Sequence, residues 1–241
     1  MVDRTAEGKR AKRVSLPLEP RRVCPDCRRP ESACYCEHVC RIETLSRVVL
    51  LQHPRERHMP LGTARMASLC LPNSELHVGN VWHRSRALLR ALSDPERPPM
   101  LLFPSPDARD LDSDPPVGPI TLIVVDGTWS NSRKMVRRDP TLSGLPKLGF
   151  RPARPSEYRI RREPHRDYLS TIEALVHVLG ALEGDRARFE PMLTPFRHMV
   201  RLQVDYIETH RGSPSRYARD RSEPRKRDSA LALVATEQAT L

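Results

Sequence analysis

Residues 121–129 read TLIVVDGTW, and this stretch decides the fold that the sequence predicts. The run from Thr121 to Val125 is apolar or β-branched throughout, which is typical of a strand whose two faces are both covered. Asp126 and Gly127 end the strand, and a helical pattern begins around Thr128. A buried strand that turns directly into a helix indicates a parallel α/β sheet.

Other apolar runs extend this pattern along the chain. Further strands are predicted at residues 46–54, 75–81 and 100–105. Helices are predicted at residues 63–71, 85–92, 128–138, 170–182 and, with breaks at Pro191 and Pro195, 185–209. This alternation of strands and helices predicts a parallel sheet with helices on both faces. Ligands of such sheets bind outside the carboxyl ends of the strands, which directs attention to His53, Ser105 and Asp126.

The turn from Asp126 to Trp129 has two interpretations. It presents a carboxylate and free backbone N–H groups at the carboxyl edge of the sheet, where a ligand could bind. Alternatively, Asp126 caps the helix, Gly127 relieves the turn and Trp129 packs in the core. The spacing by itself favours this second interpretation, because capping is the commonest role of an aspartate at such a junction.

A second helix start lies in YLSTIEA, residues 168–174. Ser170 and Glu173 have the spacing of a capping box, which needs no further role. A helix N-terminus also attracts carboxylates, including that of a cofactor with an amino-acid group. Farther upstream, QHPRE follows the first strand, and a single histidine such as His53 is more often hydrogen-bonded structure than a catalyst. No dinucleotide-binding glycine motif, P-loop or GxSxG elbow occurs, so those enzyme classes have no support.

The cysteines are concentrated near the N-terminus. Four of the six lie in CPDCRRPESACYC, residues 24–36: Cys24, Cys27, Cys34 and Cys36. Four thiolates on so short a loop are typical of a tetrahedral structural Zn2+ site. Disulfides are disfavoured in a reducing cytosol, and a redox pair would be expected at a helix start after a strand. His38 and Cys40 are rival candidates for the fourth ligand, whereas Cys70 is expected to be a small buried residue.

The charge of the chain points to a polyanionic partner. The formal net charge is +11, and residues 1–22 and 210–228 each hold seven Lys or Arg against three acidic residues. Residues 151–166 form the densest interior basic segment, with six arginines against two glutamates. Arginines interleaved with Tyr158 and Tyr168 could bind phosphates and stack on unpaired bases, which favours RNA. The basic ends alone are equally compatible with a role in solubility.

The composition divides the chain into four segments. Residues 1–20 are predicted to be a disordered basic arm, 21–45 a zinc-binding module, 46–209 the catalytic α/β domain, and 210–241 a mostly disordered basic tail. No apolar run approaches the ~20 residues that a membrane span needs. The N-terminus lacks the apolar segment of a secretory signal, so a cytoplasmic protein without a membrane partner is expected.

Five segments, taken in chain order, resemble the DTW-domain family. They are CPDCRRPESACYC (24–36), QHPRE (52–56), LLFPS (101–105), DGTW (126–129) and YLSTIEA (168–174). One departure is Gly62-Thr63, where family members tend to have Asn-Thr, and it puts in doubt any contact of that amide. The resemblance implies a SPOUT-like α/β fold with a C-terminal trefoil knot, which ordinary topology rules disfavour, beside the small zinc-binding loop module.

The resemblance also implies an activity. Members of the family transfer the 3-amino-3-carboxypropyl group of S-adenosylmethionine to N3 of a uridine in tRNA and release methylthioadenosine. In bacterial relatives the target is a uridine of the variable loop. The resemblance assigns the four cysteines of residues 24–36 to structural zinc and Asp126, Thr128 and Trp129 to the DTW motif.

Strand ends and motifs together give the expected site. Asp126 and Trp129 are expected to be catalytic: Asp126 accepts the N3 proton or holds the cofactor's ammonium group, and Trp129 or Tyr168 stacks on the extruded uracil. The residues expected around S-adenosylmethionine are Ser105, Asp126, Gly127, Thr128, Ser170, Thr171 and Glu173. Three alternatives remain open: a SPOUT-like RNA methyltransferase, an rRNA aminocarboxypropyltransferase, and a non-catalytic zinc-dependent RNA-binding module.

Overall fold

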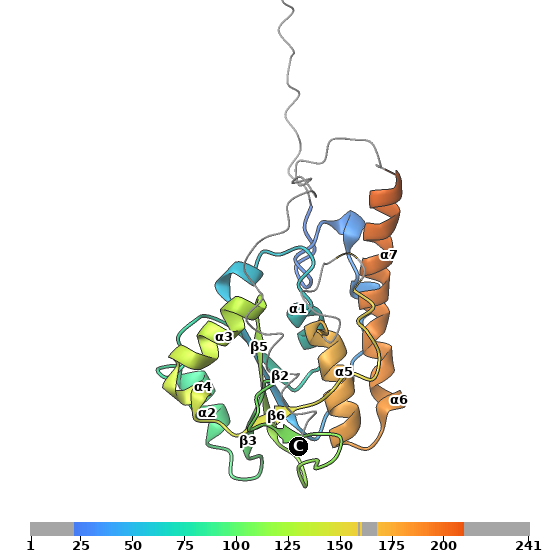
Figure 1. The fold of residues 1–241 in the computed structure, drawn as a ribbon. Coiled ribbons are helices and arrows are strands. Elements are labelled where there is room, and N and C mark those ends of the chain that lie inside the picture. Colours follow the sequence, from blue (N-terminus) through green and yellow to red (C-terminus); the bar gives the residue numbers. More distant parts are fainter. Residues whose placement is uncertain (1–21, 159, 161–167, 210–241) are drawn as a thin grey trace, which may run out of the picture. The chain divides into compact units, whose positions relative to one another are not determined.

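The computed structural model describes residues 22–158, 160 and 168–209 (Figure 1). Its contacts group the chain into two units, Met1–Gln203 and Val204–Leu241, and the sheet and the candidate site both belong to the first. The predicted arm at residues 1–20 and the predicted tail at 210–241 lie outside the described residues.

The centre of the first unit is a six-stranded sheet in the order β2-β1-β5-β3-β6-β4. Its strands are β1 (Arg47–Gln52), β2 (Ser74–Val78), β3 (Pro99–Leu102), β4 (Arg109–Asp110), β5 (Thr121–Asp126) and β6 (Lys147–Gly149). All neighbouring strands pair in parallel, and the register of β1 and β5 sets Gln52 opposite Asp126. The predicted parallel α/β sheet is confirmed, and the four predicted strands are its four longest.

Helices cover both faces of the sheet. They are α1 (Ala64–Cys70), α2 (Arg86–Leu92), α3 (Trp129–Arg138), α4 (Pro140–Ser143), α5 (Thr171–Leu182), α6 (Arg186–Phe189) and α7 (Leu193–Thr209). Short 3-10 turns are η1 (Glu31–Ala33), η2 (Cys36–His38), η3 (Pro54–Glu56) and η4 (Glu190–Met192). Figure 1 shows α2, α3 and α4 on one face and α1 and α5 on the other.

The continuous apolar runs of β1 and β5 follow from this two-sided covering. Val49 and Leu51 of β1 pack in one core with Leu88 of α2 and Met135 of α3. Leu50 alternates to the opposite face and is also fully buried, on the side where α1 contacts β1. Neither face meets water, so neither needs polar residues.

Two details of the predicted secondary structure were wrong or missing. The predicted break at Pro195 does not occur, because this proline is the third residue of α7. The first N–H groups of a helix have no intrahelical acceptor, so a proline there removes no hydrogen bond. The break near Pro191 is real and falls in η4. Strands β4 and β6 were not predicted, since two and three residues are too short for a periodic pattern.

The connections of the sheet reverse direction next to β1 and β5. From β1 the chain passes through α1 to β2 at one edge, whereas from β5 it passes through α3 and α4 to β6 on the other side. Helices α1 and α3 cover opposite faces (Figure 1). Where the direction of winding reverses in this way, ligands of α/β proteins bind outside the carboxyl ends of the two strands, so a ligand is expected in a crevice at this end of β1 and β5.

Candidate active site

Asp126 lies at this end of the sheet, as the last residue of β5. Its side chain is buried, with 8% exposed. The amide Nε2 of Gln52, at the end of β1, donates to Oδ2 of Asp126 at 2.9 Å, and Oγ1 of Thr171, at the start of α5, donates to Oδ1 at 2.7 Å. The structure therefore brings together three segments that are far apart in sequence, and it fixes the carboxylate from both sides.

The start of α5 is fixed by the predicted capping box. Glu173 is buried and accepts from the backbone N–H of Ser170 at 2.8 Å and from its hydroxyl at 2.6 Å. The same carboxylate accepts from the Ser156 hydroxyl and from the backbone N–H of Glu157, both at 2.7 Å. Glu173 thus ties the segment after β6 to the N-terminus of α5, next to Thr171.

The residues of DGTW have separate structural roles. The cap of α3 is Thr128, whose Oγ1 accepts from the backbone N–H of Asn131 at 3.3 Å, so Asp126 is not the helix cap. A Cβ on Gly127 would lie 3.1 Å from Oγ of Ser132, closer than about nine in ten real Cβ contacts. Glycine therefore permits the tight turn that brings α3 close to the end of β5.

Three aromatic rings lie together beside the DGTW segment. Trp129 lies against Tyr168 with ring centroids 4.4 Å apart, and Phe103, just after β3, lies 6.4 Å from Trp129. All three rings are half-buried, so part of each remains exposed. Such a group offers flat apolar surface for an unpaired base. Phe103 and Gln52 were missed as site residues, because nothing local distinguishes them from other residues at strand ends.

Ser105 and His53 bond elsewhere at the same edge of the sheet. The Ser105 hydroxyl donates to the carboxylate of Asp107, which also accepts a hydrogen bond from Nζ of Lys147 at 2.7 Å. Lys147 and then Ser105 lower the pKa of Asp107 to about 2. Nδ1 of His53 accepts from the backbone N–H of Arg55 and so caps η3, the structural role expected for a single histidine there. Burial, helped by the charge of Arg55, lowers the pKa of His53.

A basic groove lies along α3, next to Phe103. Its volume is about 470 Å³, and its lining includes Phe103, Arg133, Lys134, Arg137 and Lys147. Helix α3 contains no acidic residue. No described residue forms an ion pair with the basic side chains of α3 in this groove, Arg133, Lys134 and Arg137. Arg133 and Arg137 lie four residues apart on the helix, so their like charges repel each other and no acidic side chain of α3 offsets this.

The interior basic segment at residues 151–166 is only partly described. Tyr158 is buried, with 3% exposed, donates its hydroxyl to the backbone carbonyl of Leu61 and packs edge-on against Phe196. The prediction that Tyr158 stacks on RNA bases is therefore wrong, because the ring belongs to the core. Residues 159 and 161–167, which include four of the six arginines, lie outside the described residues.

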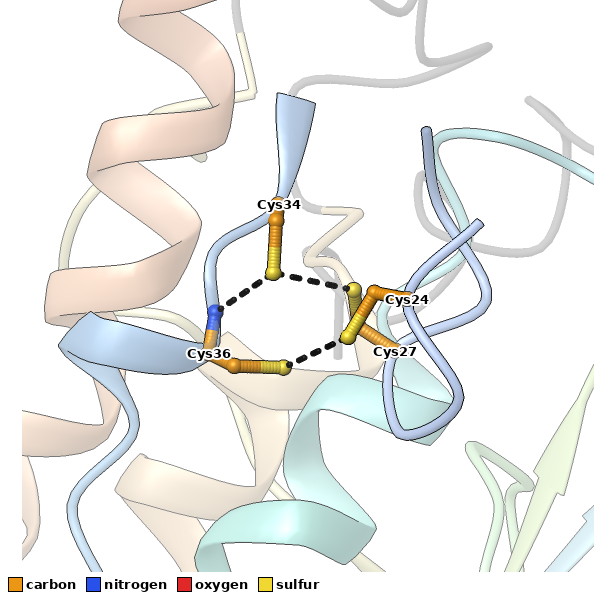
Figure 2. A group of neighbouring side chains, drawn as sticks. All are labelled: Cys24, Cys27, Cys34 and Cys36. Atoms are coloured by element: carbon orange, nitrogen blue, oxygen red, sulfur yellow. Dashed lines mark hydrogen bonds between the residues drawn. The ribbon is translucent and has the colours of Figure 1, made fainter. Parts of the chain in front are cut away.

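The four clustered cysteines converge on one point (Figure 2). Sγ of Cys24 lies 3.6 Å from Sγ of Cys36, the Cys27 and Cys34 sulfurs are 3.6 Å apart, and all four lie within 4.8 Å of one another. A tetrahedron of Zn–S bonds of about 2.3 Å has S···S edges of about 3.8 Å, so the spacing fits a metal ion. All four are free thiols, and this cluster could hold a metal ion.

The rival ligands lie outside this cluster. The His38 ring packs against the His198 ring with centroids 4.0 Å apart. Cys40 neighbours Cys70, and burial, followed by the charge of Cys40, raises the pKa of Cys70 to about 12, as expected for a small buried residue. The group that could hold a metal ion is therefore the four cysteines of residues 24–36.

The comparison with known proteins fits this geometry. The family profile described as DTW domain matches residues 21–204, most of the chain. The chain belongs to the DTW domain family. No solved structure matches it significantly.

Several relatives of this DTW domain chain bear one enzyme name. This chain is 32% identical over 197 residues to tRNA-uridine aminocarboxypropyltransferase 2 of Drosophila melanogaster, and the alignment covers 78% of each chain. It is 28% identical to the Macaca fascicularis protein of the same name, covering 79% of this chain and 67% of the relative. It is 26% identical to tRNA-uridine aminocarboxypropyltransferase A of Arabidopsis thaliana, covering 80% and 85%. Within the described residues, no helix is long and apolar enough to cross a membrane.

Proposed function

We propose that this DTW domain protein is a tRNA-uridine aminocarboxypropyltransferase. It transfers the 3-amino-3-carboxypropyl group of S-adenosylmethionine to N3 of a tRNA uridine, in the variable loop as in bacterial relatives, and releases methylthioadenosine. The observation that carries the proposal is the Asp126 carboxylate, which Gln52 and Thr171 fix at the carboxyl end of β5, near the half-buried rings of Trp129 and Tyr168. The shared name of its relatives supports the same reaction.

The reaction depends on orientation. The sulfonium of S-adenosylmethionine has three electrophilic carbons, so the product depends on which carbon faces the nucleophile. Here the bond between the sulfonium and the four-carbon arm breaks and a bond from that carbon to N3 forms. The sulfur keeps the electron pair of the broken bond, and the N3 proton leaves to a base. The protein must therefore cover the methyl group and turn the arm towards the RNA.

Asp126 serves this reaction in one of two ways. A carboxylate oxygen that accepts one hydrogen bond still has a second lone pair. Asp126 therefore either accepts the N3 proton or holds the ammonium group of the arm. Gln52 and Thr171 act as positioning residues in both cases, since they fix the carboxylate.

Other residues contact the co-substrate or the base. Gly127 and Thr128 present backbone N–H groups at the turn. Ser170 lies at the N-terminus of α5, where the helix dipole favours a carboxylate. Ser105 and Thr171 offer hydroxyl groups at the same edge, and Glu173 holds the neighbouring segment in place. Trp129, with Tyr168, stacks on the uracil, which must be unpaired because N3 is otherwise in a base pair.

The proposal extends to the fold and to the cysteine cluster. We propose that the sheet is a SPOUT-like domain with a C-terminal trefoil knot. The four cysteines hold one structural Zn2+, whose chemistry is to fold the loop that carries them. All four positions of a tetrahedral ion would be filled, so the metal has no catalytic position. A tRNA substrate also fits a cytoplasmic enzyme.

The product distinguishes this proposal from its rivals. The protein is incubated with S-adenosylmethionine and unmodified tRNA or rRNA, and the nucleosides are analysed by mass spectrometry. We expect a tRNA uridine that has gained C4H7NO2. A gain of CH2 would identify a methyltransferase. A gain of C4H7NO2 on rRNA alone would show that the substrate is rRNA and not tRNA. No gain on either RNA would favour a non-catalytic RNA-binding module.

The basic groove along α3 is the proposed binding surface for tRNA phosphates. We predict that Arg133→Gln together with Arg137→Gln weakens tRNA binding and reduces the slope of log affinity against log salt by about 1.5, because each lost phosphate contact removes about 0.7–0.9. Filter binding over a salt series measures this slope. The matched control is Arg86→Gln with Arg90→Gln, the same charge change and spacing on α2. Equal effects in both pairs would show that overall charge, not the groove, binds the tRNA.

A further inference from the structure

A second pocket lies next to Asp126, between the cysteine loop and the carboxyl end of β1. It has a volume of about 190 Å³, and its lining includes Arg29, Tyr35, Gln52, Arg57 and Arg65. Gln52 is shared with the candidate active site, because its amide donates to Asp126 at 2.9 Å. The pocket and the proposed catalytic carboxylate are therefore separated by one side chain.

Arg29 is the unusual residue of this pocket. It is 7% exposed, and neither its Nε nor its Nη1 has a hydrogen-bond partner among the described residues. Its guanidinium lies over the Tyr35 ring, 5.8 Å from the centroid. Buried charged nitrogens without a hydrogen-bond partner are costly and therefore rare, and a bound water, ion or ligand commonly supplies the partner.

The other charges of the pocket strengthen the case for an anion. Arg28, Arg57 and Arg65 line it with Arg29. Burial, and then the charge of Arg28, lowers the pKa of Arg65, and Arg57 acts in the same direction. The acidic residue of the lining, Glu56, is buried and already has a partner of its own. Four guanidinium groups thus line this pocket, and Glu56 is the one acidic side chain among its described lining residues.

Arg29 could instead serve to balance the negative charge of the four cysteine sulfurs, but this role does not explain why its Nε and Nη1 lack partners. A tetrathiolate zinc site carries net negative charge, and Arg29 is two residues from Cys27. A thiolate sulfur could accept an N–H bond, yet no described sulfur lies within hydrogen-bond distance of Nε or Nη1. The two nitrogens are therefore buried without a partner among the described residues, in a side chain that lines the pocket.

We propose that Arg29 and its pocket bind an oxyanion of the reacting complex. Two sources share this chemistry: the carboxylate of the aminocarboxypropyl arm and a phosphate of the tRNA next to the target uridine. A guanidinium pairs with either through two parallel N–H bonds. The inference rests on the proposed function, and it adds a residue outside the DTW motif that recognises the substrates.

The test compares ligands that differ only in the oxyanion. Calorimetry measures the affinity of wild type and Arg29→Gln for S-adenosylmethionine and for its decarboxylated analogue, and filter binding over a salt series measures tRNA affinity. If the arm is the source, we expect Arg29→Gln to weaken S-adenosylmethionine at least tenfold and leave the decarboxylated analogue unchanged. If a phosphate is the source, tRNA affinity falls, its salt slope falls by about 0.7–0.9, and both small ligands bind as before.

Controls separate binding from folding. Zinc content and melting temperature are measured for each variant, and Arg90→Gln on α2 controls for overall charge. Arg57 is exposed and lies outside the cysteine loop, so Arg57→Gln provides a second test of the pocket if Arg29→Gln loses zinc. We expect Arg57→Gln to weaken binding of the same ligand severalfold. The proposal is overturned if both variants bind every ligand like the wild type, or if Arg29→Gln fails to fold and Arg57→Gln binds normally. Wild type that binds neither S-adenosylmethionine nor tRNA would instead overturn the proposed function.

Discussion

Replacing Asp126 with asparagine is expected to lower the rate of uridine modification by about a thousandfold, within the range for loss of a proton-transfer group. Asparagine has the same shape as aspartate, and one orientation of its amide still accepts from Thr171 or Gln52. The fold should therefore persist, with tRNA affinity unchanged. Single-turnover assays with saturating S-adenosylmethionine measure the rate, and filter binding measures the affinity.

The same variant separates the two roles of Asp126. If the carboxylate accepts the N3 proton, the variant binds S-adenosylmethionine normally and fails only in the chemical step. If it holds the ammonium group, the affinity for S-adenosylmethionine falls as well. Asp94→Asn is the control, since this aspartate pairs with Arg97 in the loop before β3, at the opposite edge of the sheet. Wild-type modification rates in Asp126→Asn would remove Asp126 from the mechanism.

Loss of one cysteine of the cluster is expected to have the second large effect. Wild type should contain about one zinc per chain, and Cys27→Ser should contain none. Structural zinc sites contribute an apparent ~10–16 kcal/mol of binding free energy, which is free energy of folding for the segment that carries the ligands. Cys27 is buried, with 4% exposed, so its loss also leaves a hydroxyl group in the place of a metal ligand. We expect a lower melting temperature and rapid proteolysis in residues 22–40.

Cys40→Ser is the matched control for this experiment. Cys40 lies near the cluster in sequence but is not among its four sulfurs. It should retain the metal and melt close to wild type. Metal analysis by mass spectrometry and thermal unfolding measure both quantities. Metal-free wild type that is as stable as the metal-loaded protein would contradict the zinc assignment.

The sequence predicted those parts of the fold whose signals are local. The continuous apolar runs of β1 and β5 predicted a sheet covered on both faces, and residues such as Leu50 and Ile123 are fully buried there. Strand β6 and the packing of Tyr158 were not predictable in this way. Both depend on contacts between distant segments, such as the Tyr158 hydroxyl with the carbonyl of Leu61.

The candidate site divides along the same line. The four cysteines lie within thirteen residues, so their spacing was enough to predict a cluster of sulfurs that could hold a metal ion. The capping box of Ser170 and Glu173 is also local. By contrast, Thr171 meets Asp126 across forty-five residues, and Gln52 meets it across seventy-four. Chain order alone could place these side chains at one edge of the sheet but could not show that they touch.

The most direct test of the central claim is a crystal structure of the protein with S-adenosylmethionine and a short RNA that contains the target uridine. We predict that S-adenosylmethionine lies in the crevice outside β1 and β5, between Asp126 and the start of α5, with its four-carbon arm facing the uridine and its methyl group covered by protein. An empty crevice, or a methyl group that faces the base in place of the arm, would contradict this account.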